Sequence, residues 1–369
     1  MSKEKLGAEK DSCRNYGLDF LKIIATIIIV FHHYQQALNV VYPTGINYFN
    51  GSFYFGRMVE LFFIISGYVM HRYIDIIYTG RITLKDWYIK RALRLLPLVA
   101  ISAVLFECAT KVHNMVCFFD NCVPYQEIDL FGTITTGLGM QIGVAFRNPM
   151  INNPTWYVSV LILVYVIFYI VTALAKKLQV PPYYLYIFMV LFGCGIKTYG
   201  INTVFFNPGT YRGIYCFFTG ILLAQYVYNF GVTKKTALVC SGIVLTMIPI
   251  IAFKMYLLSS EVEFALSFLL FPALILLTET TTSKKIFRHD IWKLLGQFSY
   301  GVYIWHSVLI MAMLSVTHIL DIKPNYAQRK NMYLFCLICQ VAGIISYYRI
   351  EKPLDRYLKK KLRGITGNN

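Results

Sequence analysis

Apolar runs of nearly 20 residues recur ten times along this chain of 369 residues, and they constrain its fold more than any other feature. A run of that length crosses the hydrocarbon core of a bilayer as an α-helix. Hydrophobic residues make up 57% of the chain, more than one soluble core could bury. The sequence therefore predicts an all-α polytopic membrane protein. The ten predicted transmembrane spans cover residues 18–41, 57–78, 93–110, 156–175, 183–200, 211–229, 236–256, 262–279, 296–319 and 331–350.

The distribution of Lys and Arg between the loops predicts the orientation of the spans. With the N-terminus in the cytoplasm, the cytoplasmic segments hold 23 of the 35 basic residues and the outer loops hold 5. This asymmetry is typical of membrane proteins, whose cytoplasmic loops are enriched in positive charge. Residues 130–146 are also apolar, but an eleventh span there would invert every later loop. We therefore predict ten spans with both termini cytoplasmic, and a re-entrant or surface segment at 130–146.

The predicted organisation is one membrane domain with two short ends. Residues 1–17 form a cytoplasmic N-terminal segment, residues 18–350 a single ten-helix domain with an outer region at 111–155, and residues 351–369 a basic cytoplasmic tail. The net charge of +17 lies in short loops beside the spans, where topology and anionic lipid account for it. The expected partner is thus the lipid bilayer and not nucleic acid.

The nine cysteines show no metal-ligand spacing, so no metal site is predicted. Cys117 and Cys122 flank an acidic turn in the largest outer loop. The sequence is compatible with a disulfide between these two cysteines and equally with two free thiols.

Two ionisable residues share one face of the first predicted span. Lys22 and His33 are eleven residues apart, and eleven steps of about 100° return a helix to within about 20° of its starting direction. The two side chains then lie roughly 16 Å apart along the axis. An imidazole inside a span marks a functional site, or else hydrogen-bonds to a neighbouring span. Lys22 can snorkel to the headgroups, and Asp19 can neutralise it.

The second predicted span carries Glu60 about one turn inside its outer boundary. Because this span returns directly from the first, Glu60 and His33 can lie at a similar depth. A carboxylate beside an imidazole would orient the ring and raise its basicity. Alternatively, Glu60 sits in headgroup water. Ser66 and Gly67 in the same span permit close backbone approach or a local break, and small-residue helix packing explains them equally well.

Three basic residues, Lys90, Arg91 and Arg94, crowd the predicted cytoplasmic mouth of the third span. Arg91 and Arg94 are three positions apart, project from one helix face and suit phosphate oxygens. Positive-inside topology accounts for part of this cluster.

Later spans add aromatic and polar positions. Trp156 opens the fourth span, as an interfacial anchor would. In the ninth span, Ser299, Tyr303 and His306 form a polar stripe, which indicates a hydrated pocket or an interhelical hydrogen-bond network.

Together these motifs are similar to those of a known family. The chain closely resembles the acyltransferase-3 family of integral membrane O-acyltransferases, bacterial enzymes that place acetyl or other short acyl groups on surface glycans. The resemblance covers nearly the whole chain. It rests on six motifs in family order: the basic-X10-His pattern of Lys22 and His33, the acid-LFFxxSG block from Glu60 to Gly67, the RxxR pair Arg91 and Arg94 before Pro97, the WYxS block from Trp156 to Ser159, the LGxxSYxxYxWH block from Leu295 to His306, and the IEKP block from Ile350 to Pro353.

The resemblance implies that His33 is the essential histidine, that Lys22 is the basic residue paired with it, and that Arg91 and Arg94 are the family's arginines. It also implies acetyl-CoA or another short acyl-CoA as co-substrate, a glycan or lipid-linked saccharide as acceptor, and the inner membrane of a bacterium as location. The sequence departs from the family at two positions. Lys22 stands where arginine is commoner, and Leu161 where many members carry an acid.

These expectations combine into one mechanism and two rivals. Arg91, Arg94 and Lys90 would hold the CoA phosphates, while His33 acts as general base or carries the acyl group itself. Ser66, Trp156, Tyr303 and His306 would line the substrate pocket. One rival is a proton-coupled transporter with His33, Glu60 and His306 as a relay, and the other is a multi-span scaffold or sensor. The sugar, the acyl chain and the oligomeric state, including a homo-oligomer, are left open.

Overall fold

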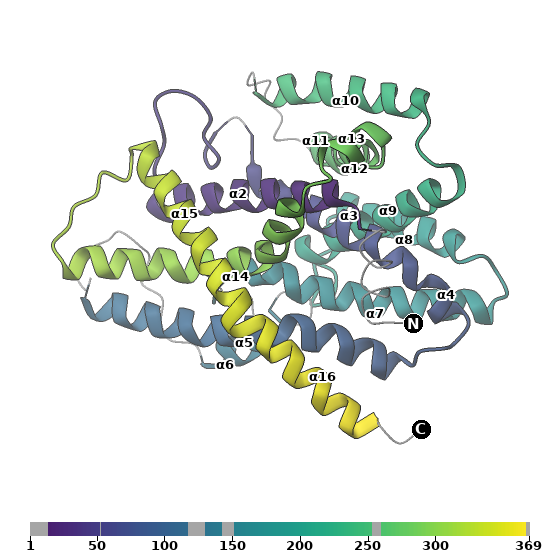
Figure 1. Ribbon diagram of the computed structural model, residues 1–369, viewed down its shortest axis with the longest axis horizontal. Helices are drawn as coiled ribbons and strands as arrows, with labels where there is room; N and C mark the ends of the chain where they lie inside the picture. The colour runs from purple at the N-terminus through teal and green to yellow at the C-terminus, as the bar shows by residue number, and fades with distance from the viewer. Residues whose placement is uncertain (1–13, 52, 117–129, 142–150, 253–259, 367–369) are drawn as a thin grey trace.

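The computed structural model describes residues 14–51, 53–116, 130–141, 151–252 and 260–366, and within these ranges it contains helices and loops but no strand (Figure 1). The predicted all-α class is therefore confirmed. The first half contains α2 (Tyr16–Leu38), η1 (Phe55–Arg57), α3 (Met58–Met70), η2 (His71–Tyr73), α4 (Ile74–Tyr78), α5 (Leu84–Val116), α6 (Leu130–Gly137), η3 (Asn153–Thr155), α7 (Trp156–Lys177) and α8 (Pro182–Thr198). The second half contains α9 (Pro208–Phe230), α10 (Lys234–Ala252), α11 (Ser260–Ala265), η4 (Leu266–Leu270), α12 (Phe271–Thr278), α13 (Thr281–Ile286), α14 (Asp290–Ile319), α15 (Arg329–Ser346), η5 (Tyr347–Glu351) and α16 (Lys352–Thr366).

Each of the ten predicted spans coincides with a helix or a run of helical segments in this structure. Within the described part of the chain, seven helical stretches are long and apolar enough to cross a membrane. They are Tyr16–Leu38, Phe55–Tyr78, Leu84–Val116, Asn153–Lys177, Lys234–Ile251, Asp290–Ile319 and Arg329–Leu358. The other three predicted spans fall on α8, α9 and the α11–α12 stretch, which are shorter or less apolar. The chain is thus a multi-pass membrane protein, and the count of ten and the cytoplasmic ends stay predictions.

The apolar segment at 130–146 does not form a further span in its described part. Its helix, α6, has only eight residues, or about 12 Å of length, and packs against α5. That length is well short of the roughly 30 Å hydrocarbon core. Residues 142–150, as well as Cys117 and Cys122, lie outside the described residues.

The helices α2 and α14 run side by side in the same direction. Asp19 lies against Gly296 near the start of both helices, and His33 contacts His306 further along both. Successive spans cross the membrane in opposite directions, so the first and ninth predicted spans, α2 and α14, must run in the same direction. An additional crossing between them would have reversed α14, so the packing agrees with a non-spanning α6.

The helices α3 and α9 also run in the same direction and touch backbone to backbone. A Cβ atom at Gly67 would overlap the carbonyl oxygen of Phe217, and one at Gly220 would overlap that of Ile64. Glycine at both positions therefore allows a crossing that any larger residue would push apart. The close approach expected from Gly67 is confirmed, and it determines which face of α3 meets α9.

Candidate active site

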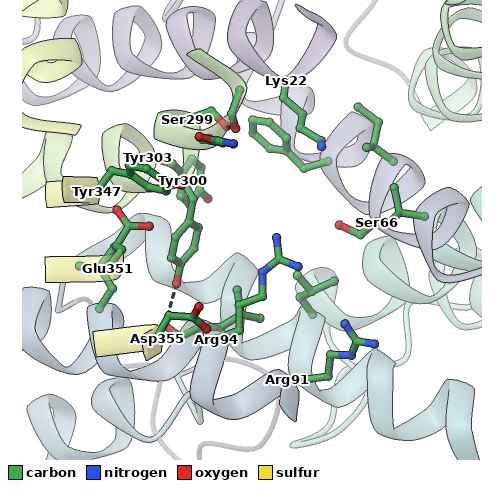
Figure 2. A pocket seen from close by; sticks show the side chains of 18 of the residues that line it. Lys22, Ser66, Arg91, Arg94, Ser299, Tyr300, Tyr303, Tyr347, Glu351 and Asp355 are labelled. Atoms are coloured by element: carbon green, nitrogen blue, oxygen red, sulfur yellow. Dashed lines mark hydrogen bonds between the residues drawn. The ribbon is translucent and has the colours of Figure 1, made fainter. Parts of the chain in front are cut away.

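A cavity of about 520 Å³ lies between α2, α3, α5, α7, α14 and the turn from η5 into α16 (Figure 2). Its lining carries more positive than negative side chains. The cations are Arg14, Lys22, Arg91, Arg94 and Lys352, and the carboxylates are Asp19, Glu351 and Asp355. An excess of cations around a cavity attracts an anionic ligand.

Lys22 and Arg14 share one buried carboxylate at the wall of this cavity. Asp19 accepts from Arg14 Nε at 2.7 Å and from Lys22 Nζ at 3.3 Å. The expected pairing of Lys22 with Asp19 is therefore present. Because one carboxylate faces two cations, this part of the wall keeps a net positive charge.

Arg94 is the cation best placed to meet a ligand. It makes no hydrogen bond or ion pair with any described residue, and its guanidinium extends toward the centre of the cavity (Figure 2). A guanidinium in this position can bind a phosphate through two parallel N–H donors.

Arg91 lines the same cavity but is held differently. Its guanidinium carbon lies 4.2 Å from the ring centroid of Trp87 and 4.4 Å from that of Tyr73, and the residue is buried. These cation–π contacts give Arg91 a packing role as well as a charge. The predicted shared face of Arg91 and Arg94 is confirmed. Lys90 is exposed and lies outside the cavity lining, because it precedes Arg91 by one position and so projects about 100° away.

Three aromatic rings, which we call the ring triad, line the end of the cavity away from the predicted cytoplasmic side: Phe62, Tyr157 and Tyr303. All three pairs are in contact, with ring centroids 5.7 to 5.8 Å apart. The Tyr157 hydroxyl is 3.1 Å from the Ser66 hydroxyl, and the Tyr303 hydroxyl donates to the Pro154 carbonyl at 2.7 Å. Since both hydroxyls are engaged, the triad presents an apolar surface to the cavity.

Ser66 and Tyr303 were predicted to line a pocket and do line this cavity, whereas His306, predicted with them, is not part of the lining, and Tyr157 was not predicted. A signal was available, because Tyr157, Leu161 and Tyr165 are spaced by four and all three line the cavity from α7.

A histidine pair lies directly beyond the ring triad. His33 Nδ1 on α2 is 2.8 Å from His306 Nε2 on α14, and the Tyr303 ring centroid is 5.8 Å from that of His306. His306 is buried, whereas His33 is half-buried and its Nε2 makes no hydrogen bond with a described residue. The two alternatives for His33, a functional site and a hydrogen bond to a neighbouring span, are therefore compatible. His33 hydrogen-bonds to α14 through Nδ1 and keeps Nε2 available.

The facing nitrogens of this pair share one hydrogen atom. When His33 Nδ1 carries it and donates to His306, Nε2 of His33 retains a lone pair. That nitrogen can then remove a proton or attack a carbonyl carbon. His306 then has the orienting position that a carboxylate holds in a hydrolase triad.

The neighbouring His32 has a different part in the structure. Its Nδ1 donates to the Tyr48 carbonyl at 2.7 Å, and Gln35 Oε1 accepts from the backbone N–H groups of Tyr48 and Phe49. These bonds hold the predicted outer loop, residues 42–56, against the end of α2 that carries His33.

The expected interaction between Glu60 and His33 is wrong. Both Glu60 carboxylate oxygens accept from Arg212, with Nε–Oε1 at 2.8 Å and Nη2–Oε2 at 2.9 Å. The reason is rotational: Glu60 and Gly67 are seven residues apart, so they share a face of α3, and Gly67 packs against α9. The proposed relay of His33, Glu60 and His306 therefore loses its carboxylate.

Glu60 belongs to a larger group of charges at the predicted outer ends of several spans. Glu263 forms ion pairs with Arg57 and Lys197, each with an N–O distance of 2.7 Å, and Arg57 also contacts Glu60 at 3.4 Å. The ring of Trp156 lies 5.0 Å from the Arg212 guanidinium carbon, so Trp156 packs here and not in the cavity.

The sequence carries a signal for these additional charges that the predictions above do not include. Lys197, Arg212 and Glu263 are lone charges in otherwise apolar runs, each near a predicted outer boundary, where a buried Glu60 would find its counter-ions.

Comparison with known proteins agrees with this geometry. A family model described as an acyltransferase domain, that of the acyltransferase-3 family, matches residues 15–348. No curated protein and no solved structure matches the chain. The matched range extends from the start of α2 into η5 and so contains most of the cavity lining and the histidine pair. The chain therefore belongs to the acyltransferase-3 family and is a membrane acyltransferase.

Proposed function

We propose that the protein transfers a short acyl group, such as acetyl, from a cytoplasmic acyl-CoA to a hydroxyl of a cell-surface or lipid-linked carbohydrate, in the inner membrane of a bacterium. One observation carries this proposal. A cavity with an excess of cations ends at the ring triad, and the histidine pair with its available Nε2 lies directly behind those rings.

The charge of the cavity supports a CoA ester as donor. Arg94 and Lys22 would contact the phosphates, and Arg91 would add its charge from the aromatic wall. The pantetheine arm would then extend toward His33, roughly 16 Å from Lys22 along α2. Arg14 and Lys352, which adjoin the two predicted cytoplasmic segments, line this cavity, and this supports donor entry from the predicted cytoplasmic side.

The chemistry at His33 can take two forms. As general base, Nε2 takes the proton of the acceptor hydroxyl while the hydroxyl oxygen bonds to the thioester carbonyl carbon; the carbon–sulfur bond then breaks, and Nε2 returns the proton to the sulfur so that CoA leaves as the thiol. As nucleophile, Nε2 bonds to the carbonyl carbon while the carbon–sulfur bond breaks and CoA leaves as the thiolate; the acceptor hydroxyl then attacks the acyl carbon, the bond to Nε2 breaks, and the hydroxyl proton ends on the thiolate. In either form, His306 keeps the Nδ1 hydrogen in place and stabilises the positive imidazolium.

The decisive experiment measures both CoA release and acyl transfer. Purified protein in nanodiscs receives radiolabelled acetyl-CoA and a bacterial glycan extract, and we expect glycan-dependent release of CoA thiol with label in the glycan. Absence of CoA release with every short acyl-CoA offered would contradict the proposal. A proton-coupled transporter would instead accumulate substrate in proteoliposomes without using acyl-CoA.

The two arginines are expected to respond differently to substitution. Arg94→Ala should raise the KM for acetyl-CoA about 10- to 100-fold at unchanged melting temperature, because Arg94 would make charged hydrogen bonds to the ligand and makes no hydrogen bond or ion pair with a described residue. Arg91→Ala should also lower the melting temperature, because it empties the space between Trp87 and Tyr73.

Lys90→Ala is the matched control for both arginine variants. It removes a neighbouring positive charge from the same helix, outside the cavity lining. Its KM should equal that of the wild type. An equal rise in KM for Lys90→Ala and Arg94→Ala would show that general charge, and not the cavity, governs donor binding.

His306 should act by positioning His33. His306→Ala is expected to lower kcat about 100-fold without changing the KM for acetyl-CoA, since the donor-binding wall stays intact. His306→Gln should recover part of that loss, because its amide oxygen can accept from His33 Nδ1. Steady-state kinetics of both variants test this, and an unchanged kcat in His306→Ala would exclude the pair from the mechanism.

A further inference from the structure

The ring triad lies between the donor cavity and the histidine pair. On α14, Tyr303 lines the cavity and His306 follows three residues later, about 4.5 Å further along the axis. On α2, Thr26 lines the cavity and His33 follows seven residues later, about 10 Å further. The rings therefore occupy the position that the reacting end of a donor must reach.

An acyl-CoA that enters from the cytoplasm brings its acyl chain first. The carbonyl carbon that reacts lies between the sulfur and that chain, so the chain has to find space beside or beyond the reacting position. In the structure this space is bounded by the ring triad. Tyr157 and Tyr303 are buried and fixed by their hydroxyl hydrogen bonds, so they cannot easily yield to a longer chain.

Phe62 is the member of the triad that can yield. Its contacts to the other two members are ring contacts, and it has no polar group that truncation would leave unpaired. It lies on the cavity face of α3 with Ser66 and Val69, four and seven positions further toward the cytoplasmic mouth.

We infer that Phe62, Tyr157 and Tyr303 form an acyl-chain subsite that restricts the donor to very short acyl groups, and that Phe62 sets the limit. This inference rests on the proposed function and adds to it the class of acyl group that is transferred. If the triad served helix packing alone, its truncation would change stability and leave the preference for acyl chains unaltered.

The test compares kcat/KM for acetyl-, butyryl- and hexanoyl-CoA with one glycan extract. An added methylene that a pocket cannot accommodate costs roughly 10- to 200-fold in kcat/KM. We expect the wild type to prefer acetyl-CoA over butyryl-CoA by at least about tenfold. Phe62→Ala should reduce this ratio by at least about tenfold, mainly through faster use of butyryl-CoA.

Val69→Ala is the matched control. Val69 lines the same cavity from the same helix face, two turns closer to the mouth, so its truncation enlarges the cavity away from the ring triad. The ratio of acetyl to butyryl activity should stay at the wild-type value. Phe62→Leu, which preserves more of the packing, should shift the ratio in the same direction as Phe62→Ala by a smaller factor.

Three results would overturn the inference: a wild type that prefers butyryl- or hexanoyl-CoA, a change in Phe62→Ala that is proportional for all three donors, or an equal shift in Val69→Ala. Each of them leaves CoA release by the wild type, and with it the proposed acyl transfer from acyl-CoA to the glycan, intact. Failure of the wild type to use any of the three donors would instead contradict the proposed function.

Discussion

Replacing His33 by alanine should abolish acyl transfer, with a loss of at least about 1,000-fold in kcat, within the range attributed to a positioned general base. The variant loses His33 Nε2, a ring nitrogen that lies behind the ring triad and makes no hydrogen bond with a described residue. The measurement is transfer of labelled acetyl to glycan, together with CoA release.

Donor binding separates loss of chemistry from loss of structure in this variant. The lining of the cavity does not include His33, so His33→Ala should bind acetyl-CoA with the affinity of the wild type. Intact binding with no transfer is the expected combination. Residual transfer above a tenth of the wild-type rate in purified His33→Ala would remove His33 from the mechanism.

The same variant also distinguishes the two forms of the mechanism. Without acceptor, an acyl-imidazole would retain label from acetyl-CoA on the wild-type protein but not on His33→Ala. A general base would leave both proteins unlabelled.

Helical periodicity accounts for what the sequence alone predicts well. The positions of the helices follow from apolar runs, and the shared face of Arg91 and Arg94 follows from their spacing. The close approach at Gly67 follows from its lack of a side chain. Each of these statements concerns one helix, whose geometry is determined by local hydrogen bonds.

The partner of His33 depends instead on how helices rotate against each other. Glu60 and His306 were both at a suitable depth, but the crossing of α3 and α9 turns Glu60 toward Arg212. Helical spacing alone shows that Glu60 shares a face of α3 with Gly67, where another helix can approach closely. The spacing does not show which neighbouring helix packs against that face.

The position of Glu351 illustrates a second limit. The π-helical segment η5, Tyr347–Glu351, interrupts the regular turn between α15 and α16, and Glu351 lies in the wall of the cavity (Figure 2). A π-turn shifts the phase of every later residue, so a stripe drawn with ordinary helical spacing misplaces it. Many family members carry an acidic residue at the position of Leu161, which has no carboxylate. Glu351, in η5, places a carboxylate in the wall of the same cavity.

Glu60→Ala should destabilise the fold by about 3–5 kcal/mol, the usual cost of removing one partner of a buried ion pair. Glu60 is 1% exposed, and its loss leaves the Arg212 guanidinium without the carboxylate that binds it at two positions. We expect a lower melting temperature in detergent, and a transfer rate per folded molecule close to that of the wild type.

The double variant Glu60→Met/Arg212→Leu provides the control for this stability effect. The double variant contains neither charge of the pair, so no unpaired charge stays buried. The melting temperature of the double variant should therefore lie above that of Glu60→Ala. The catalytic role first expected for Glu60 makes the opposite prediction. In that case, Glu60→Ala would keep its melting temperature and lose transfer as completely as His33→Ala, and the ion pair with Arg212 would have to open during the reaction.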